Sequence, residues 1–233
     1  AAQRGWLTNY PEYNQSYTEM LRRQLDVTAK LEPFSDFTMD LIANRNYMEN
    51  YSEQYDVSPN GMYNSLSPYQ TGNFAITTSL IRTSFKKSDE VTSDAFQDFR
   101  DNRLTIANRL ASGRGIDINN PVNLDDEGFP LGYGKNSQAV LIPAFLSAYT
   151  GASASGVSLD AFRNIPIPNW NVKYTGLMRY KFFKDTFRRF SLQHGYRASY
   201  TINSFRSNFE YDNNPNRKHA TGNFYNKTLI GNV

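Results

Sequence analysis

Strict alternation of apolar and polar residues is the feature that most constrains how this chain folds. In the segment Leu25–Leu31 every second residue is apolar, and the residues between are polar or charged. A period of two sends these two sets to opposite faces of an extended strand. A short turn at 32–36 and a second alternating run from Phe37 to Asn44 follow. The sequence therefore predicts an antiparallel hairpin with one apolar and one polar face.

Further strands are expected along the chain. The second arm of the hairpin is expected to continue through Tyr47 into a loop at 50–70, which is rich in Asn, Tyr and Ser. The other expected strands are Asn73 to about Phe85, Trp170–Tyr174, the longest strand at 190–203, and an incomplete strand at 224–225.

The composition fits a sheet with two unlike faces. The chain holds 16 Tyr and 16 Phe, yet its mean hydropathy is −0.63, as in strands with one apolar and one wet face. The lack of cysteine excludes a disulfide scaffold and a thiolate metal site. A net charge of +3 gives no basic footprint for nucleic acid. The longest apolar run, Ala139–Leu146, is far shorter than the roughly 20 residues of a transmembrane helix.

In the middle of the chain the period becomes helical. The spacing predicts a helix at 94–112, capped by Ser93 or Asp94, and a second helix at about 137–150 that contains Pro143. This region is amphipathic and too long for an ordinary barrel turn, so we expect it to contact a partner or form a cap. The residues expected to make that contact are Phe96, Phe99, Arg103, Ile106 and Leu110.

These patterns divide the chain into three parts. Residues 1–90 and 166–233 are assigned to barrel strands and loops, and residues 91–165 to a helical insertion and linker. Within the last part, Leu177–Phe187 mixes phenylalanines with Lys and Arg, which is typical of a segment at a membrane interface.

The number of strands does not suffice for a closed barrel. About five or six are recognisable, whereas the smallest single-chain outer-membrane barrels have about 8. A sheet that spans a bilayer cannot leave its edges unpaired in lipid, so these strands either pair with strands outside this chain or lie in water. The expected fold class is mainly β, with antiparallel transmembrane β-barrel strands that form part of a very large barrel, and a helical insertion.

The alternation assigns residues to the two sides of such a wall. The residues expected to face the lumen are Gln24, Asp26, Thr28, Lys30, Thr38, Asp40, Arg197 and Thr201. The residues expected to face lipid are Leu25, Val27, Leu31, Phe37, Met39, Leu41, Leu192, Tyr196 and Tyr200.

Several short segments, in order from about Gly5 to Phe209, match one known family. They are Gly5-Trp6-Leu7-Thr8, Leu31-Glu32-Pro33-Phe34, Ala43-Asn44-Arg45, Glu49-Asn50-Tyr51-Ser52-Glu53, Asn102-Arg103-Leu104, Gly132-Tyr133-Gly134-Lys135-Asn136-Ser137-Gln138, Leu141-Ile142-Pro143-Ala144-Phe145, Pro168-Asn169-Trp170 and His194-Gly195-Tyr196-Arg197. Through them the chain resembles the C-terminal part of the SprA/Sov family, the outer-membrane translocons of the type IX secretion system.

The resemblance implies a location, a function and partners. It implies a single giant outer-membrane barrel with an aqueous lumen that passes folded cargo proteins to the cell surface. The implied partners are the remainder of the same barrel, outer-membrane lipid, a shuttle protein of the PorV type at a lateral opening, a periplasmic plug protein and the secreted cargo. No bond chemistry and no cofactor are implied, so the chain is not expected to be an enzyme.

Other sites are weaker. Gly134-Lys135 lacks the glycine and hydroxyl positions of a phosphate loop, and the acidic run Asp125–Glu127 lacks the alternating spacing of a calcium loop. His194 and His219 have no second metal ligand nearby in the sequence. The alternative function is a soluble secreted β-sheet protein that binds glycans through an aromatic groove.

Overall fold

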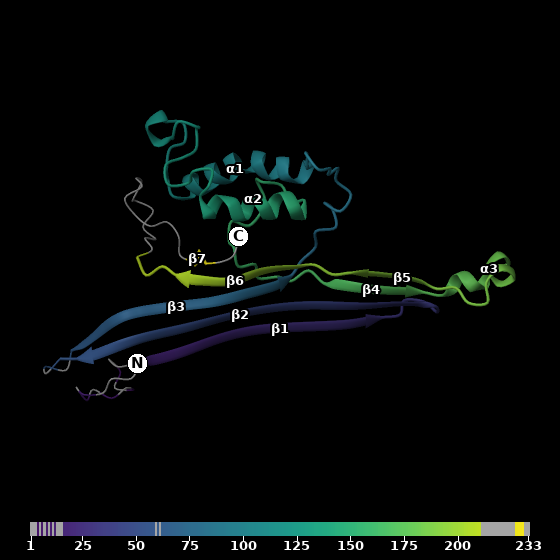
Figure 1. Cartoon of the computed structure of the whole chain (residues 1–233), viewed down its shortest axis with the longest axis horizontal. Coiled ribbons are helices and arrows are strands. Elements are labelled where there is room, and N and C mark those ends of the chain that lie inside the picture. Colours follow the sequence, from purple (N-terminus) through teal and green to yellow (C-terminus); the bar gives the residue numbers. More distant parts are fainter. Residues whose placement is uncertain are drawn as a thin grey trace.

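The protein is mainly antiparallel β-sheet with a small helical layer on one face (Figure 1). The computed structural model describes residues 16–58, 60, 62–210 and 227–230, together with Arg4, Trp6, Thr8, Tyr10 and Glu12. Within these residues a seven-stranded sheet carries two principal helices. The predicted mainly β class is therefore confirmed.

The first hairpin is longer than its alternation predicts. β1 (Tyr17–Leu31) pairs with β2 (Phe37–Val57) over the whole length of β1, and the turn between them holds Asp36 at φ +72°. Aspartate tolerates this left-handed conformation better than most residues. The hairpin is confirmed, but the predicted loop at 50–70 is wrong. β2 runs through this segment as far as Val57 and β3 (Tyr63–Thr77) begins at Tyr63, because pairing across the sheet overrides the turn preference of Asn and Ser.

Two strands placed end to end fill the next row of the sheet. β3 pairs with the second half of β2, and β4 (Asn169–Tyr174) pairs with its first half. Both run antiparallel to β2, and the Ile167 amide donates to the Thr77 carbonyl at 3.0 Å where they meet. Residues 78–168 therefore form an insertion in the middle of one strand row. The strand predicted to reach about Phe85 ends at Thr77.

The following row is also split. β5 (Leu192–Tyr196) pairs with β4, β6 (Ser199–Ser207) pairs with β3, and β7 (Lys227–Leu229) pairs with β6. The continuous strand predicted at 190–203 is interrupted where the Ala198 amide donates to Asn169 Oδ1 at 2.9 Å. The rows follow one another as an up-and-down meander. The predicted strand at 224–225 lies outside the described residues.

The insertion forms its own core. α1 (Asp94–Gly113) begins at Ser93, whose Oγ accepts the Phe96 amide, and α2 (Gln138–Thr150) ends at Gly151 with φ +71°. Both predicted helices are confirmed, and the predicted boundaries at 91 and 165 lie inside the inserted segment 78–168. The described residues also contain the short helices η2 (Pro121–Asn123), η3 (Gly176–Arg179) and α3 (Lys181–Thr186).

None of the helices in the described part of the chain combines the length and the apolar character needed to cross a bilayer.

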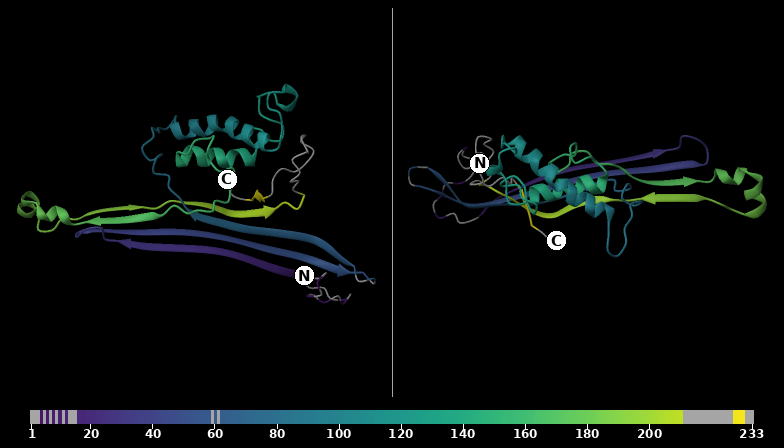
Figure 2. Two further views of the ribbon diagram at one scale, coloured as in Figure 1. Left: turned by 180° about the vertical axis from the view of Figure 1, so that it is seen from behind. Right: turned by 90° about the horizontal axis from the view of Figure 1, so that it is seen from above.

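The helical layer covers only part of the sheet. Phe74, Ile76, Ile202 and Phe205 form a buried cluster between the sheet and Phe162 of the insertion. The views from behind and from above place α1 and α2 over the middle of the sheet, while the β4–β5 end extends beyond them (Figure 2). β1 is exposed on both faces along almost its whole length.

A substitution at Gly72 tests how closely β3 packs against β2 and β6. A side chain there would collide with the backbone oxygen of Met48 and the ring of Phe205. We expect Gly72→Ala to destabilise the β3–β6 region by about 3 kcal/mol, because a packed core resists an added methyl group. Hydrogen–deuterium exchange at β3 and β6 measures the loss. Gly113→Ala is the control, since no heavy atom beyond its chain neighbours and the backbone of its own helix lies within 4 Å of its added carbon. Unchanged exchange in both variants would contradict the packing.

Candidate functional site

The strand register gives the sheet two faces of opposite character. All nine residues predicted to face lipid lie on one face, called here the apolar face: Leu25, Val27, Leu31, Phe37, Met39, Leu41, Leu192, Tyr196 and Tyr200. Seven of the residues predicted to face a lumen lie on the other, called the polar face: Gln24, Asp26, Thr28, Lys30, Thr38, Asp40 and Thr201. Arg197 lies in the break between β5 and β6.

Part of the apolar face is uncovered. Leu25, Val27, Leu31 and Leu192 are each 45–50% exposed, although they stand in regular strands. The rows that contain them run along β2 from Phe37 to about residue 45, a length of about 25 Å at the usual rise of a strand. We call this stretch the uncovered band. Large side chains exposed in contiguous rows are unusual for a sheet in water.

Aromatic side chains of β4 and β5 stack and form hydrogen bonds where the uncovered band approaches the insertion. The rings of Trp170 and Tyr196 stack with centroids 4.5 Å apart, and the Trp170 indole N–H donates to His194 Nδ1 at 3.1 Å. The Tyr196 hydroxyl accepts the Leu80 amide at 2.6 Å as the inserted segment leaves the sheet. His194 therefore serves as a hydrogen-bond partner of Trp170. Tyr200 also lies on the apolar face, but it packs beneath α2 against the core of the insertion, so the prediction that it faces lipid is wrong.

The polar face carries amides, hydroxyls and charges in the same rows. Asp26 accepts hydrogen bonds from the side-chain amides of Gln24 and Asn44, and Lys30 forms an ion pair with Glu32 at 3.1 Å. These groups are exposed, so water can hydrate them. The same strands therefore present a hydrated surface on one side and an apolar surface on the other.

Towards the far end of β2, past the uncovered band, the apolar face carries charged and hydroxyl side chains. Glu49 is buried, and its carboxylate accepts a hydrogen bond from Lys227 Nζ. The same Nζ also donates to Ser207 Oγ at 2.6 Å. Glu53, also buried, accepts the hydroxyls of Tyr51 at 2.7 Å, Ser65 at 2.6 Å, and Tyr63. Sequence reasoning missed both groups. The residues around Glu53, called here the Glu53 cluster, come together only through the register of β2 with β3 and the bulge at Glu53. The residues around Glu49 come together through the pairing of β3 with β6 and of β6 with β7.

The hydroxyl donors control the ionisation of Glu53. Burial raises the pKa of this carboxyl, but the hydrogen bonds from Ser65, Tyr63 and Tyr51 outweigh burial and hold it below its ordinary value. Burial, followed by the hydrogen bond to Glu53, raises the pKa of Tyr51 and of Tyr63 to about 12. At physiological pH the cluster therefore consists of an ionised carboxylate that accepts hydrogen bonds from neutral hydroxyl groups.

The residues predicted to contact a partner from the first helix mostly face inward. Ile106 is completely buried, and Phe99 and Leu110 pack against the same core. Arg103 lies over the Phe99 ring at 5.8 Å and donates to the Arg100 carbonyl at 3.2 Å. Only Phe96 is as much as half exposed. The prediction is corrected for Ile106, because the stripe is chiefly the surface through which α1 packs within the insertion.

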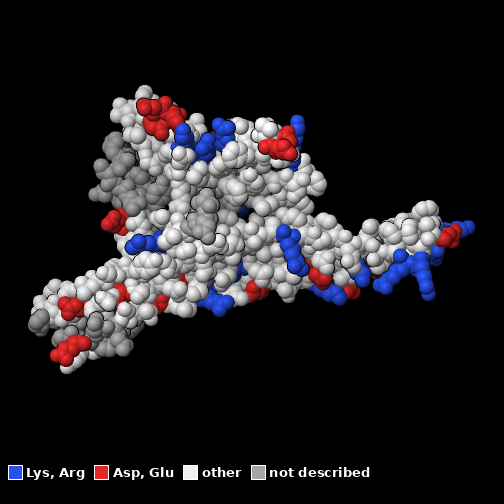
Figure 3. Space-filling model, viewed as in Figure 1, with Lys and Arg blue, Asp and Glu red and all other residues white. Residues whose placement is uncertain are grey.

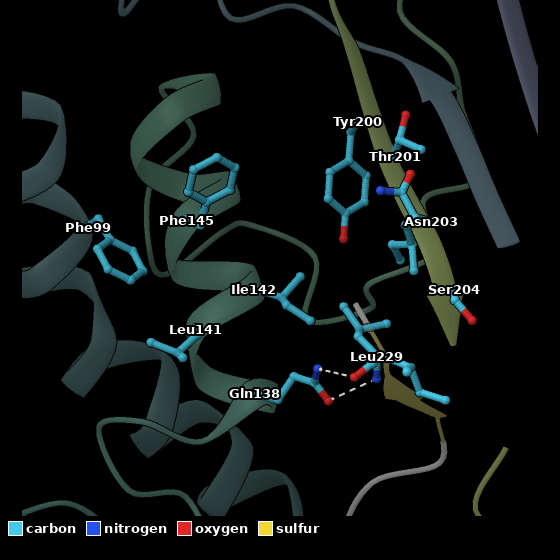
Figure 4. Close-up of a pocket in the computed structure, with 12 residues that line it drawn as sticks. Phe99, Gln138, Leu141, Ile142, Phe145, Tyr200, Thr201, Asn203, Ser204 and Leu229 are labelled. Atoms are coloured by element: carbon cyan, nitrogen blue, oxygen red, sulfur yellow. Dashed lines mark hydrogen bonds between the residues drawn. The ribbon is translucent and has the colours of Figure 1, made fainter. Parts of the chain in front are cut away.

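A pocket lies between α2 and the sheet (Figure 4). It has a volume of about 400 Å³ and is lined mainly by apolar side chains from α1, α2, β6 and β7. Gln138 spans its rim, donating to the Leu229 carbonyl at 3.4 Å and accepting the Leu229 amide at 3.2 Å. The Tyr200 hydroxyl is buried with no hydrogen-bond partner among the described residues. No sequence signal marked this pocket.

The weaker sequence candidates are internally bonded turns. Asp125 Oδ1 accepts the amides of Glu127 and Phe129, and Lys135 pairs with the Glu127 carboxylate. In the described ranges no three His, Asp or Glu side chains gather as metal ligands would.

No model of a protein family matches the chain, and no curated protein matches it.

The Glu53 cluster predicts a pH dependence with a defined sign. Because the pKa of Glu53 is lowered on folding, its stabilisation is present above the ordinary carboxyl value of 4.5 and is lost as the pH falls through the folded pKa. Because the tyrosine pKa values are raised, their contribution is present below 10.0 and is lost as the pH rises towards about 12.

Glu53→Gln is expected to remove the acid-side dependence and to destabilise the β2–β3 end by about 2 kcal/mol, since hydrogen bonds to a charged acceptor are stronger. Hydrogen–deuterium exchange, corrected for the intrinsic rate at each pH, measures both effects. The matched control is Glu19→Gln, because Glu19 is exposed and accepts a single tyrosine hydroxyl. An equal response of the two variants would contradict the role of Glu53.

Proposed function

We propose that this chain forms part of the wall of the protein-conducting outer-membrane barrel of type IX secretion. The observation that carries the proposal is the uncovered band of the apolar face, which lies directly opposite a hydrated polar face in the same antiparallel strands. Barrels of the outer membrane present an outward apolar band about 25 Å tall and a polar interior. About nine residues of β2 run alongside the uncovered band, which agrees with the roughly 9–11 residues of a tilted transmembrane strand.

The open edges of the sheet support a wall that continues beyond this chain. Within the described residues, β1 has no strand on its outer side, and both of its faces are exposed. An edge strand cannot remain unpaired in lipid, because no water is available to satisfy its backbone groups. The remainder of the same barrel is therefore the first partner, and outer-membrane lipid is the second.

In this proposal the chain acts without bond chemistry. Polar residues such as Gln24, Asp26 and Thr28 line a wide aqueous pore, and cargo proteins pass along it. The family resemblance adds a shuttle protein of the PorV type, a periplasmic plug and secreted cargo as further partners. A soluble glycan-binding protein, the alternative suggested by the sequence, would leave the uncovered band in water, so we do not adopt it.

Lysines introduced into the band test the wall directly. We expect Leu25→Lys with Val27→Lys to abolish barrel assembly in the outer membrane, because each lysine costs about 2–4 kcal/mol near the middle of the bilayer. The matched control is Asp26→Lys with Thr28→Lys in the same strand. Heat-modifiable migration of the full-length protein and export of cargo measure the result. Intact assembly of the first variant and loss of the second would overturn the assignment of the faces.

The native mass provides an independent test. We expect the polypeptide that carries this sequence to be a very large chain in the outer-membrane fraction, extracted only by detergent. Mass spectrometry of that fraction identifies it. A free chain near 26.7 kDa in the aqueous fraction would contradict the proposal and would make glycan binding the next function to test.

A further inference from the structure

The connection between β4 and β5 gathers aromatic rings at one end of the molecule. In residues 175–190 the ring of Phe183 lies 5.0–6.0 Å from those of Phe182, Phe187 and Phe190. Phe183 and Phe190 are half-buried, whereas Phe182 is 68% exposed and Phe187 is also exposed. The cluster therefore turns apolar surface outward instead of towards a core.

Positive charge surrounds these rings. Lys181, Lys184, Arg188 and Arg189 are exposed, and none of them forms an ion pair with another described residue. The only carboxylate in residues 175–190 is Asp185. Figure 3 shows basic side chains concentrated at this end of the molecule. The segment thus combines exposed rings with cations that lack counter-charges.

The segment is held firmly at the end of the uncovered band. The Thr175 amide donates to the Asp36 carbonyl at 2.9 Å, and Arg179 donates to Ser35 Oγ at 2.7 Å and pairs with the Asp36 carboxylate. Phe34 of the same turn contacts the rings of Phe37 and Tyr174 at centroid distances of 5.0 and 6.3 Å. The last row of the band and residues 175–190 therefore form one continuous surface.

We infer that residues 175–190 bind the anionic headgroups of the surrounding membrane lipids. This inference rests on the proposed membrane wall, because that wall brings the segment to the level of the headgroups. Exposed phenylalanines enter the boundary between headgroups and acyl chains, and basic side chains attract lipid phosphate groups. The continuity of the rings with the uncovered band favours lipid over an acidic protein as the occupant.

Photocrosslinking of the full-length protein tests this site. The protein is reconstituted in nanodiscs of phosphatidylcholine with a minority of phosphatidylglycerol, with p-benzoylphenylalanine in place of Phe182. We expect phosphatidylglycerol among the crosslinked lipids at about five times its bulk fraction, the effect of a single effective cation at a membrane surface. Substituting Lys181, Lys184, Arg188 and Arg189 by Gln together should return this ratio to the bulk value, as should high salt.

Two controls separate this inference from the proposed function. Lys87→Gln with Arg100→Gln removes exposed charge from the insertion and should leave the enrichment unchanged. The same photocrosslinker at Val27 should capture lipid within the uncovered band. Lipid captured at Val27 but not at position 182, enrichment that survives the four substitutions, or crosslinks to protein alone would overturn the headgroup site. Failure at both positions would overturn the membrane wall as well.

Discussion

The hydrogen-bond ladder of β2 is the constraint on which the rest of the structure depends. β2 pairs with β1 along one edge and with β3 and β4, end to end, along the other. Because side chains alternate strictly across a strand, the register of β2 fixes which residues of every neighbouring row share a face. A slip of one residue would exchange Val27 with Asp26 or Thr28 and would destroy the contrast between the faces. The two-faced wall is thus a property of one register.

The insertion at 78–168 interrupts the strand row beside β2, but hydrogen bonds close the interruption. Where the row breaks, the Ile167 amide donates to the Thr77 carbonyl and the Thr78 amide donates to the Ala198 carbonyl at 3.1 Å. Arg45 Nε also donates to the Arg163 carbonyl at 2.8 Å, which ties the returning segment to β2. Backbone groups that lose their strand partners are therefore satisfied locally, as buried polar groups require. A helical unit can interrupt the sheet in this way while the meander continues on both sides.

The sequence predicted the features that depend on local periodicity. The first hairpin, α1, α2 and β4 follow from alternation, helical spacing and capping by Ser93, and the face of each strand residue follows from its parity. The extension of β2 and β3 through 50–70 was not predictable, since Asn, Ser and Tyr become strand residues there only through pairing. The Glu53 cluster likewise depends on register, because its members come from both β2 and β3. The helical spacing of the residues of α1 follows from the sequence, but the packing of this helix inside the insertion depends on where α2 lies.

The two ends of the uncovered band differ, and this difference gives the sheet a direction relative to the proposed membrane. At one end the rings and cations of 175–190 follow the last apolar row, while at the other the face passes beneath the insertion and then to buried Glu49 and Glu53. β2 has 21 residues and extends about 70 Å at the usual strand rise, well beyond the height of a bilayer core. Only its first part, alongside the uncovered band, can meet lipid without burying carboxylates there. In the proposed membrane wall, the remainder of the strand would therefore project from the membrane on the side of the insertion, and the helices would lie outside the bilayer against the protruding wall.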